Sequence, residues 1–199
     1  GNAIYQDRLY MNDGKGKFSL SVNALPEMNN SGASVVAADY DKDGDLDLFV
    51  CGRVSPGEYP ISPNSILLRN DVSNGAAKFT DVSAAQLPQQ GNMGMVTSAL
   101  WTDFDNDSWI DLVAAGEFMP ITFIKNEKGK LLNNQPLTIN NSQGWWNSLV
   151  AGDFDNDGDQ DLFVNHDFGY KRTPDMLLEN QFPKKKYLDV AVKQGIDLK

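Results

Sequence analysis

A nine-residue acidic pattern occurs three times in this chain and limits what the chain can fold into. The copies span residues 39–47, 103–111 and 153–161, and each has aspartate at positions 1, 3, 5 and 9. Together they contain 14 of the 22 aspartates in the sequence. Four or five carboxylates in so short a segment repel one another unless a cation neutralises them. These segments are called loops one, two and three below.

The spacing of the aspartates suits a bound calcium ion. Alternate carboxylates in a tight loop can converge on one point, and Ca²⁺ takes about 6–8 oxygen ligands. Glycine at position 6 permits a sharp turn, position 7 offers its backbone carbonyl, and position 9 closes the site. We expect the position-7 carboxylates to point to solvent. The predicted ligands are Asp39, Asp41, Asp43, Asp45 and Asp47 in loop one, Asp103, Asp105, Asp107, Trp109 and Asp111 in loop two, and Asp153, Asp155, Asp157, Asp159 and Asp161 in loop three.

Loop two departs from the pattern at two positions. Ser108 replaces glycine at position 6, where a left-handed conformation costs a non-glycine residue about 1–2 kcal/mol. Trp109 replaces aspartate at position 7, which matters less if only its carbonyl binds. The sequence therefore predicts up to three Ca²⁺ ions, with the middle site the weakest.

The loop sequences allow two other interpretations. An EF-hand begins in the same way but needs glutamate at position 12, at the start of a helix. Position 12 is here Val50, Ala114 or Val164, and an apolar run of this kind favours a strand. The second alternative is a solvated turn without metal, because Asp, Asn and Gly favour turns in any case.

The segments around the loops predict an all-β fold. Residues 5–22 read as a hairpin, and residues 33–83, 96–139 and 146–192 each contain four short apolar runs separated by turn residues. Repeats of this size with four short strands are typical of propeller blades, and no helix is expected. The prediction is one partial β-propeller of about three blades plus a leading hairpin. Because propellers usually need about 4–8 blades to close, we expect a fragment of a longer protein or self-association through open blade edges.

The loops with their following strands resemble the FG-GAP/VCBS repeats of calcium-binding β-propellers, such as those of integrin α-chain heads and many bacterial surface proteins. The resemblance extends from about Arg8 to Val192. Two further stretches, Gly116–Ile121 and Gly144–Ser148, look similar to secreted VCBS-repeat proteins of gut-type Bacteroidetes. The resemblance implies a propeller fold with one calcium ion in each loop.

Composition and residue inventory exclude several classes of function. The net charge of −10 argues against nucleic-acid binding, which needs a basic face. No apolar run is long enough for a transmembrane helix. Cys51 and His166 are the only residues of their types and lie in different blades, so Ser/His/Asp and Cys/His catalysis lack parts. We expect Cys51 to be buried and His166 to be a surface or hydrogen-bonded residue.

The expected function is a non-enzymatic calcium-binding scaffold that recognises a protein or carbohydrate at the cell surface. Open loops of this kind are usually weak sites, which fill where calcium is millimolar, so an extracellular, cell-surface or periplasmic location is expected. Trp145 and Trp146 are candidate ligand-binding residues, although neighbouring strand residues face opposite sides and one of them could be core. The alternative is the propeller portion of a polysaccharide-degrading enzyme whose catalytic residues lie outside this fragment.

Overall fold

The computed structural model describes residues 5–28, 31–72, 75–166, 174–184 and 186–196, and this part of the chain is an all-β fold. A leading hairpin pairs β1 (Tyr10–Asn12) with β2 (Phe18–Leu20). Three four-stranded antiparallel units follow it, and we call them blades one, two and three. The predicted fold class, a partial β-propeller, is confirmed.

The blades share one strand order. Blade one consists of β3 (Ser31–Ala38), β4 (Asp47–Val54), β5 (Ile66–Asn70) and β6 (Phe79–Asp81). Blade two consists of β7 (Met95–Thr102), β8 (Asp111–Met119), β9 (Thr122–Ile124) and β10 (Leu137–Thr138). Blade three consists of β11 (Gly144–Gly152), β12 (Asp161–His166), β13 (Met176–Asn180) and β14 (Tyr187–Asp189). In each blade an acidic loop joins the first strand to the second.

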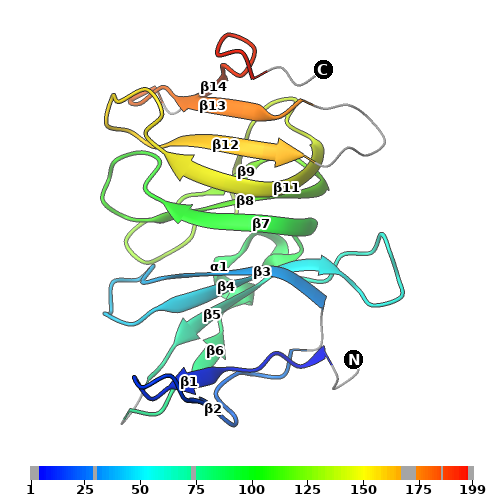
Figure 1. The fold of residues 1–199 in the computed structure, drawn as a ribbon, viewed down its shortest axis with the longest axis vertical. Helices are drawn as coiled ribbons and strands as arrows, with labels where there is room; N and C mark the ends of the chain where they lie inside the picture. Colours follow the sequence, from blue (N-terminus) through cyan, green and yellow to red (C-terminus); the bar gives the residue numbers. More distant parts are fainter. Residues whose placement is uncertain (1–4, 29–30, 73–74, 167–173, 185, 197–199) are drawn as a thin grey trace.

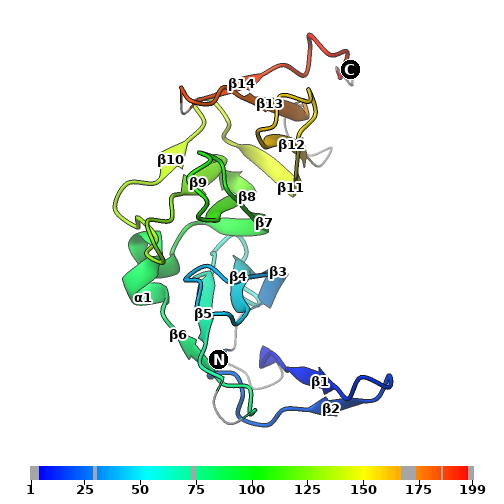
Figure 2. The same cartoon turned by 90° about the vertical axis from the view of Figure 1, so that its left-hand side faces the viewer.

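The blades follow one another along an open curve. Figure 1 shows them stacked between the hairpin at one end and the C-terminal segment at the other, with the three acidic loops along one edge. Seen from the side, the stack bends without closing a ring (Figure 2). Blades two and three also share ladder pairs, because Gly144 and Trp145 at the start of β11 pair with the end of β8, whereas β11 pairs with β12 from Trp146 onward.

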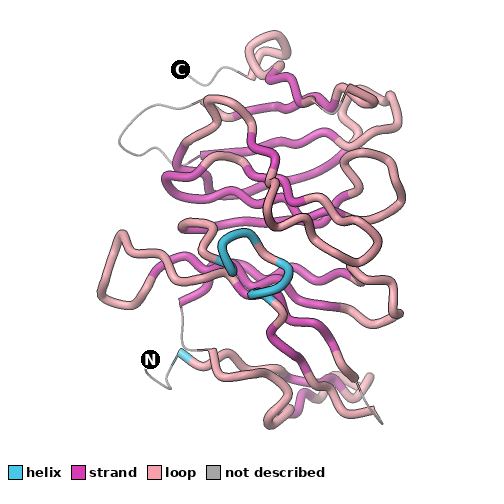
Figure 3. The backbone as a smooth tube through the Cα atoms, turned by 180° about the vertical axis from the view of Figure 1, so that it is seen from behind, coloured by secondary structure: helices cyan, strands magenta, loops and turns pink. Residues whose placement is uncertain are grey.

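One element between blades one and two was not predicted. A short helix, α1 (Ser83–Gln86), and a 3₁₀ turn, η2 (Pro88–Gly91), connect β6 to β7 and lie on the side of the molecule seen in Figure 3. The expectation of no helix was wrong here because a four-residue helix is too short to show a helical period. None of the helices in the described residues is long and apolar enough to cross a membrane.

Alternating residues of the second strands build the core between the blades. On β8, Leu112 and Ala114 pack toward blade one, whereas Val113 and Ala115 pack toward blade three. On β4 the same alternation sends Phe49 and Cys51 toward blade two. Each blade is thus a two-faced sheet, and hydrophobic burial requires a neighbour on both faces. Cys51 is fully buried, as expected.

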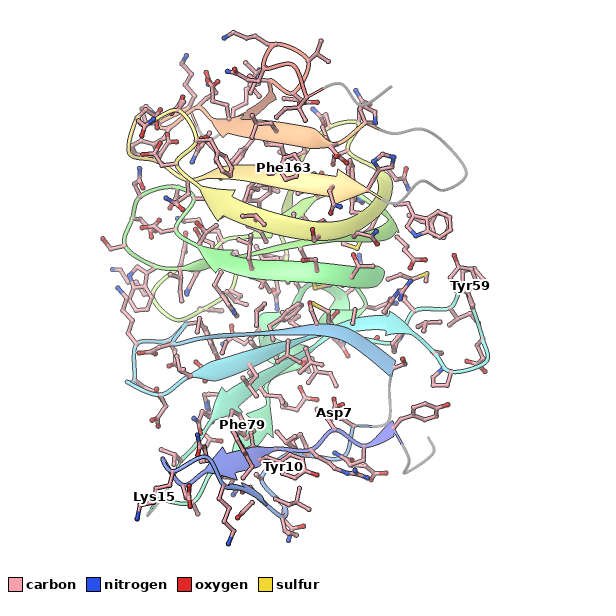
Figure 4. The ribbon with its side chains drawn as sticks, in the orientation of Figure 1. Asp7, Tyr10, Lys15, Tyr59, Phe79 and Phe163 are labelled. Carbon is pink, nitrogen blue, oxygen red and sulfur yellow. The ribbon has the colours of Figure 1, made fainter. Side chains whose placement is uncertain are left out.

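We predict that the same residue change costs much more stability between blades than at the open end of the stack. Phe49 and Phe163 occupy equivalent positions, each two residues after the last aspartate of its loop. Phe49 is fully buried between blades one and two, whereas Phe163 on β12 is only partly buried (Figure 4). Phe49→Ala should lower the free energy of unfolding by about 3–5 kcal/mol, and Phe163→Ala by less than half of that. Urea unfolding measures both, and equal losses would show that blade stacking is not what buries these side chains.

Candidate metal centres

The first aspartate of each loop holds the turn in shape. Its two carboxylate oxygens accept hydrogen bonds from the backbone N–H groups of positions 5 and 6, at 2.7–3.1 Å in all three loops. In loop one these donors are Asp43 and Gly44, and the acceptor is Asp39. The position-5 carboxylate then accepts the N–H of position 7. Each loop is therefore folded by its own carboxylates.

The three loops have the same backbone conformation. Positions 4 and 6 have positive φ in every copy, including the non-glycine Ser108 at 71°, against 98° and 95° for the glycines in loops one and three. Holding serine there costs about 1–2 kcal/mol, but the loop still adopts the glycine geometry. The replacement of glycine in loop two has not changed the path of the chain.

The last aspartate of each loop is a buried hub. Asp47, Asp111 and Asp161 are at most 2% exposed. One oxygen accepts the N–H of position 2, at 2.9–3.3 Å, and the other accepts the N–H of an asparagine in the third strand or just after it, at 2.6–2.8 Å. The hub thus connects the start of the loop, its end and the third strand of the blade.

Carboxylates converge in each loop. Ligand atoms lie within 4.8 Å of one another in the triplets Asp39, Asp41 and Asp43, then Asp103, Asp105 and Asp111, and finally Asp153, Asp155 and Asp161. Buried oxygens Oδ1 of Asp41 and Oδ1 of Asp159 have no hydrogen-bond donor among the described residues. Clustered hard oxygens of this kind suit an oxygen-seeking divalent cation, so the residues present fit a calcium ion.

The remaining predicted ligands have other surroundings. Asp47, Asp107 and Asp157 are not part of these triplets. Asp45 is half-buried, whereas the Asp159 side chain is buried, so the expectation that position-7 carboxylates point to solvent was wrong for loop three. There the chain folds the carboxylate inward near Tyr187, whose hydroxyl donates to the Gln160 carbonyl at 3.1 Å.

Two lysines contact loop two. The Lys125 ammonium bridges the carboxylates of Asp105 and Asp107. Lys42, from loop one, donates to the Ser108 carbonyl at 2.7 Å and lies 4.2 Å from the centroid of the Trp109 ring. The middle loop is therefore held by cationic side chains on two sides.

The two tryptophans proposed for ligand binding have different environments. Trp146 is fully buried, and its indole N–H donates to the Ser142 carbonyl at 2.8 Å, so it is a core residue and cannot stack on a ligand. Trp145 is partly exposed, with its ring centroid 5.3 Å from that of Phe118. His166 lies 3.1 Å from the Asp175 carboxylate, which agrees with the hydrogen-bonded role expected for it.

Comparison with known families agrees with the repeated loop geometry. The model of the FG-GAP-like repeat matches residues 2–50 and 103–164, which make up more than half of the chain and include all three loops. The chain belongs to the FG-GAP-like repeat family. No curated protein matches it.

One asparagine in each blade belongs to the site and was not predicted from the sequence. Besides donating its N–H to the buried hub, each asparagine uses its side-chain amide as a donor. Asn126 donates to the Tyr40 carbonyl of loop one at 2.7 Å, and Asn180 to the Phe104 carbonyl of loop two at 3.0 Å. The signal was present, because each third strand is followed or closed by asparagine after one charged residue. Asn126 and Asn180 therefore connect neighbouring loops, whereas Asn70 binds the Leu46 carbonyl of its own loop.

Burial raises the pKa of two hub carboxylates. The pKa of Asp111 is about 7 and that of Asp47 about 6, in each case chiefly because the group is removed from water. Neighbouring loop aspartates raise both values further, whereas the N–H donors of the hub oppose the rise. A carboxylate with a raised pKa binds its proton more tightly in the folded state than in the unfolded state.

We predict that the metal-free protein loses stability as the pH rises. The stabilisation from protonated Asp47 and Asp111 is complete below the unfolded pKa near 3.8 and is lost as the pH passes through about 6 and about 7. The melting temperature of protein freed of divalent ions on a chelating resin should therefore fall between pH 5 and pH 8. A melting temperature that rises through this window would contradict the assignment.

Proposed function

We propose that this chain is a calcium-stabilised, non-enzymatic propeller scaffold that recognises a protein or glycan outside the cytosol. The supporting observation is that three loops of one backbone conformation each bring carboxylates within 4.8 Å of one another at one edge of the blades. A single such loop is common without metal, whereas three copies with one internal hydrogen-bond pattern favour a shared ligand.

The proposed role of the ion is structural. Each loop joins the first two strands of a blade, so an ion that binds only the folded loop adds its binding free energy to folding. When bound, calcium supplies the positive charge that the clustered carboxylates lack. The chain itself contributes the preformed turn and the buried hub that fixes the position of the loop relative to β5, β9 or β13.

The opposite edge of the blades offers a candidate recognition surface. Three segments meet at this edge: the loop that follows β4, the end of β8 and the start of β11. Buried Glu117 accepts hydrogen bonds from Arg53, at 2.8 and 2.7 Å, and from the Tyr59 hydroxyl at 3.1 Å, and it pairs with Trp145 in the β8–β11 ladder. Tyr59 and Phe118 are 55% and 53% exposed. Figure 4 shows Tyr59 at the edge away from the acidic loops.

This surface has the chemistry for sugar binding. Exposed aromatic rings present flat apolar faces, and Arg53 keeps a half-exposed guanidinium beside them. Hydrogen bonds to buried Glu117 hold Arg53 and Tyr59 in place before a ligand arrives, which reduces the entropy lost on binding.

Location and assembly follow from the same proposal. Weak calcium loops fill in extracellular, cell-surface or periplasmic surroundings, where calcium is millimolar.

The outer face of blade three exposes apolar side chains, including Val150 at 53% and Phe154 at 48%, and self-association through this face would bury them.

We predict that calcium stabilises the protein. Saturating calcium should raise the melting temperature of the chelator-treated protein by several degrees, because only the folded loops bind it. Asp41→Asn with Asp155→Asn, which removes one carboxylate from each outer loop, should abolish most of that rise. Glu58→Gln, an exposed charge outside the loops, should leave it intact. Melting curves that calcium does not shift would rule out the metal part of the proposal.

We predict that carbohydrate binding depends on the exposed aromatic residues. On a glycan array, Tyr59→Ala and Trp145→Ala should each weaken binding about two- to tenfold, since a lost stacking contact is worth about 0.5–1.5 kcal/mol. Phe18→Ala removes a ring of the hairpin that is 62% exposed, against 55% for Tyr59, and should change nothing. Equal losses in all three variants would argue against this surface. Turnover of a bound polysaccharide would favour the enzyme alternative.

A further inference from the structure

One position beside each loop carries a different charged residue in each blade, positive in blades one and two and negative in blade three. It is the residue immediately before the loop-binding asparagine, and it is Arg69 in blade one, Lys125 in blade two and Glu179 in blade three. Because the asparagine N–H binds the buried hub, its neighbour is fixed near the loop in every blade. The three blades thus place a different side chain at one structural position.

Lys125 uses this position to enter loop two. Its Nζ atom contacts Oδ2 of Asp105 and lies 2.7 Å from Oδ2 of Asp107. Only 21% of the Lys125 side chain and 4% of the Asp105 side chain are exposed. Asp105 belongs to the carboxylate triplet that would hold an ion in loop two, so the ammonium already binds one of the carboxylates that the ion would use.

The corresponding side chains leave loops one and three open. Arg69 turns toward Asp71, outside the loop, with its Nε atom 2.8 Å from Oδ1 of that residue. Glu179 adds a carboxylate where Lys125 adds a cation, and it lines a hollow of about 160 Å³ together with Asp155 and Asp161.

We propose that Lys125 is the resident counter-cation of loop two, so that the protein has two exchangeable calcium sites, in loops one and three. The inference rests on the proposed function, because it specifies which of the three loops exchange calcium. A divalent ion entering loop two must displace the ammonium or bind beside it against charge repulsion. Loop backbone geometry does not explain a weak middle site, since Ser108 adopts the conformation of the glycines.

The test is calorimetric titration of the full chain with calcium alone. Wild-type protein should bind two ions tightly, and Lys125→Gln should bind three, with the affinity of the third site at least tenfold above any third event in the wild type. Lys125→Arg keeps a cation and should stay at two. Lys128→Gln removes the same charge from an exposed residue of the adjacent turn and should also stay at two.

A double variant assigns the gained site. Lys125→Gln with Asp103→Asn should lose the third ion while keeping two, because Asp103 belongs to loop two. Thermal melting with and without calcium identifies unfolded variants, since a folded Lys125→Gln protein should regain in calcium the stability that it loses in chelator.

The outcomes separate the two proposals. Three equivalent sites in the wild type, or no additional site in Lys125→Gln, would overturn the role of Lys125 and leave calcium binding intact. No binding by wild type or variant would overturn both.

Discussion

The structure depends on one buried carboxylate in each blade, the ninth residue of the acidic loop. Its two oxygens accept one N–H from the start of the loop and one from the asparagine of the third strand. A buried carboxylate without donors would be very costly, and one with two backbone donors is tolerated. Because the two donors come from the same positions in each blade, this aspartate fixes the loop on the blade and gives the three repeats the same hydrogen-bond pattern.

The asparagine extends this arrangement from one blade to the next. Its N–H serves the hub of its own blade, and in blades two and three its side-chain amide reaches the carbonyl at position 2 of the preceding loop. Neighbouring blades are therefore joined both by polar contacts at the loop edge and by apolar packing between the sheets. Tyr40 takes part in both kinds of contact. Its ring is stacked on Trp101 with 6.0 Å between the ring centroids, and its backbone carbonyl accepts the Asn126 amide.

The sequence was informative wherever a physical pattern repeated. Alternate aspartates followed by apolar runs were enough to predict the fold and the loops, because each pattern has a period that a strand or a turn requires. Single contacts were not predictable. Nothing in the sequence alone distinguishes buried Trp146 from partly exposed Trp145, since strand phase depends on the bulge in β11. The inward turn of Asp159 likewise depends on the packing of blade three.

The contrast among the loops bears on how such a repeat protein responds to its surroundings. An exchangeable ion stabilises a loop only where the ion is abundant, whereas a tethered ammonium acts at any calcium concentration and costs the ordering and partial desolvation of its own side chain. Blade two is the blade that packs against both of its neighbours, through separate clusters on its two faces. With Lys125 as its cation, the central blade would remain stable without calcium, and calcium would control how stably the two outer blades are folded.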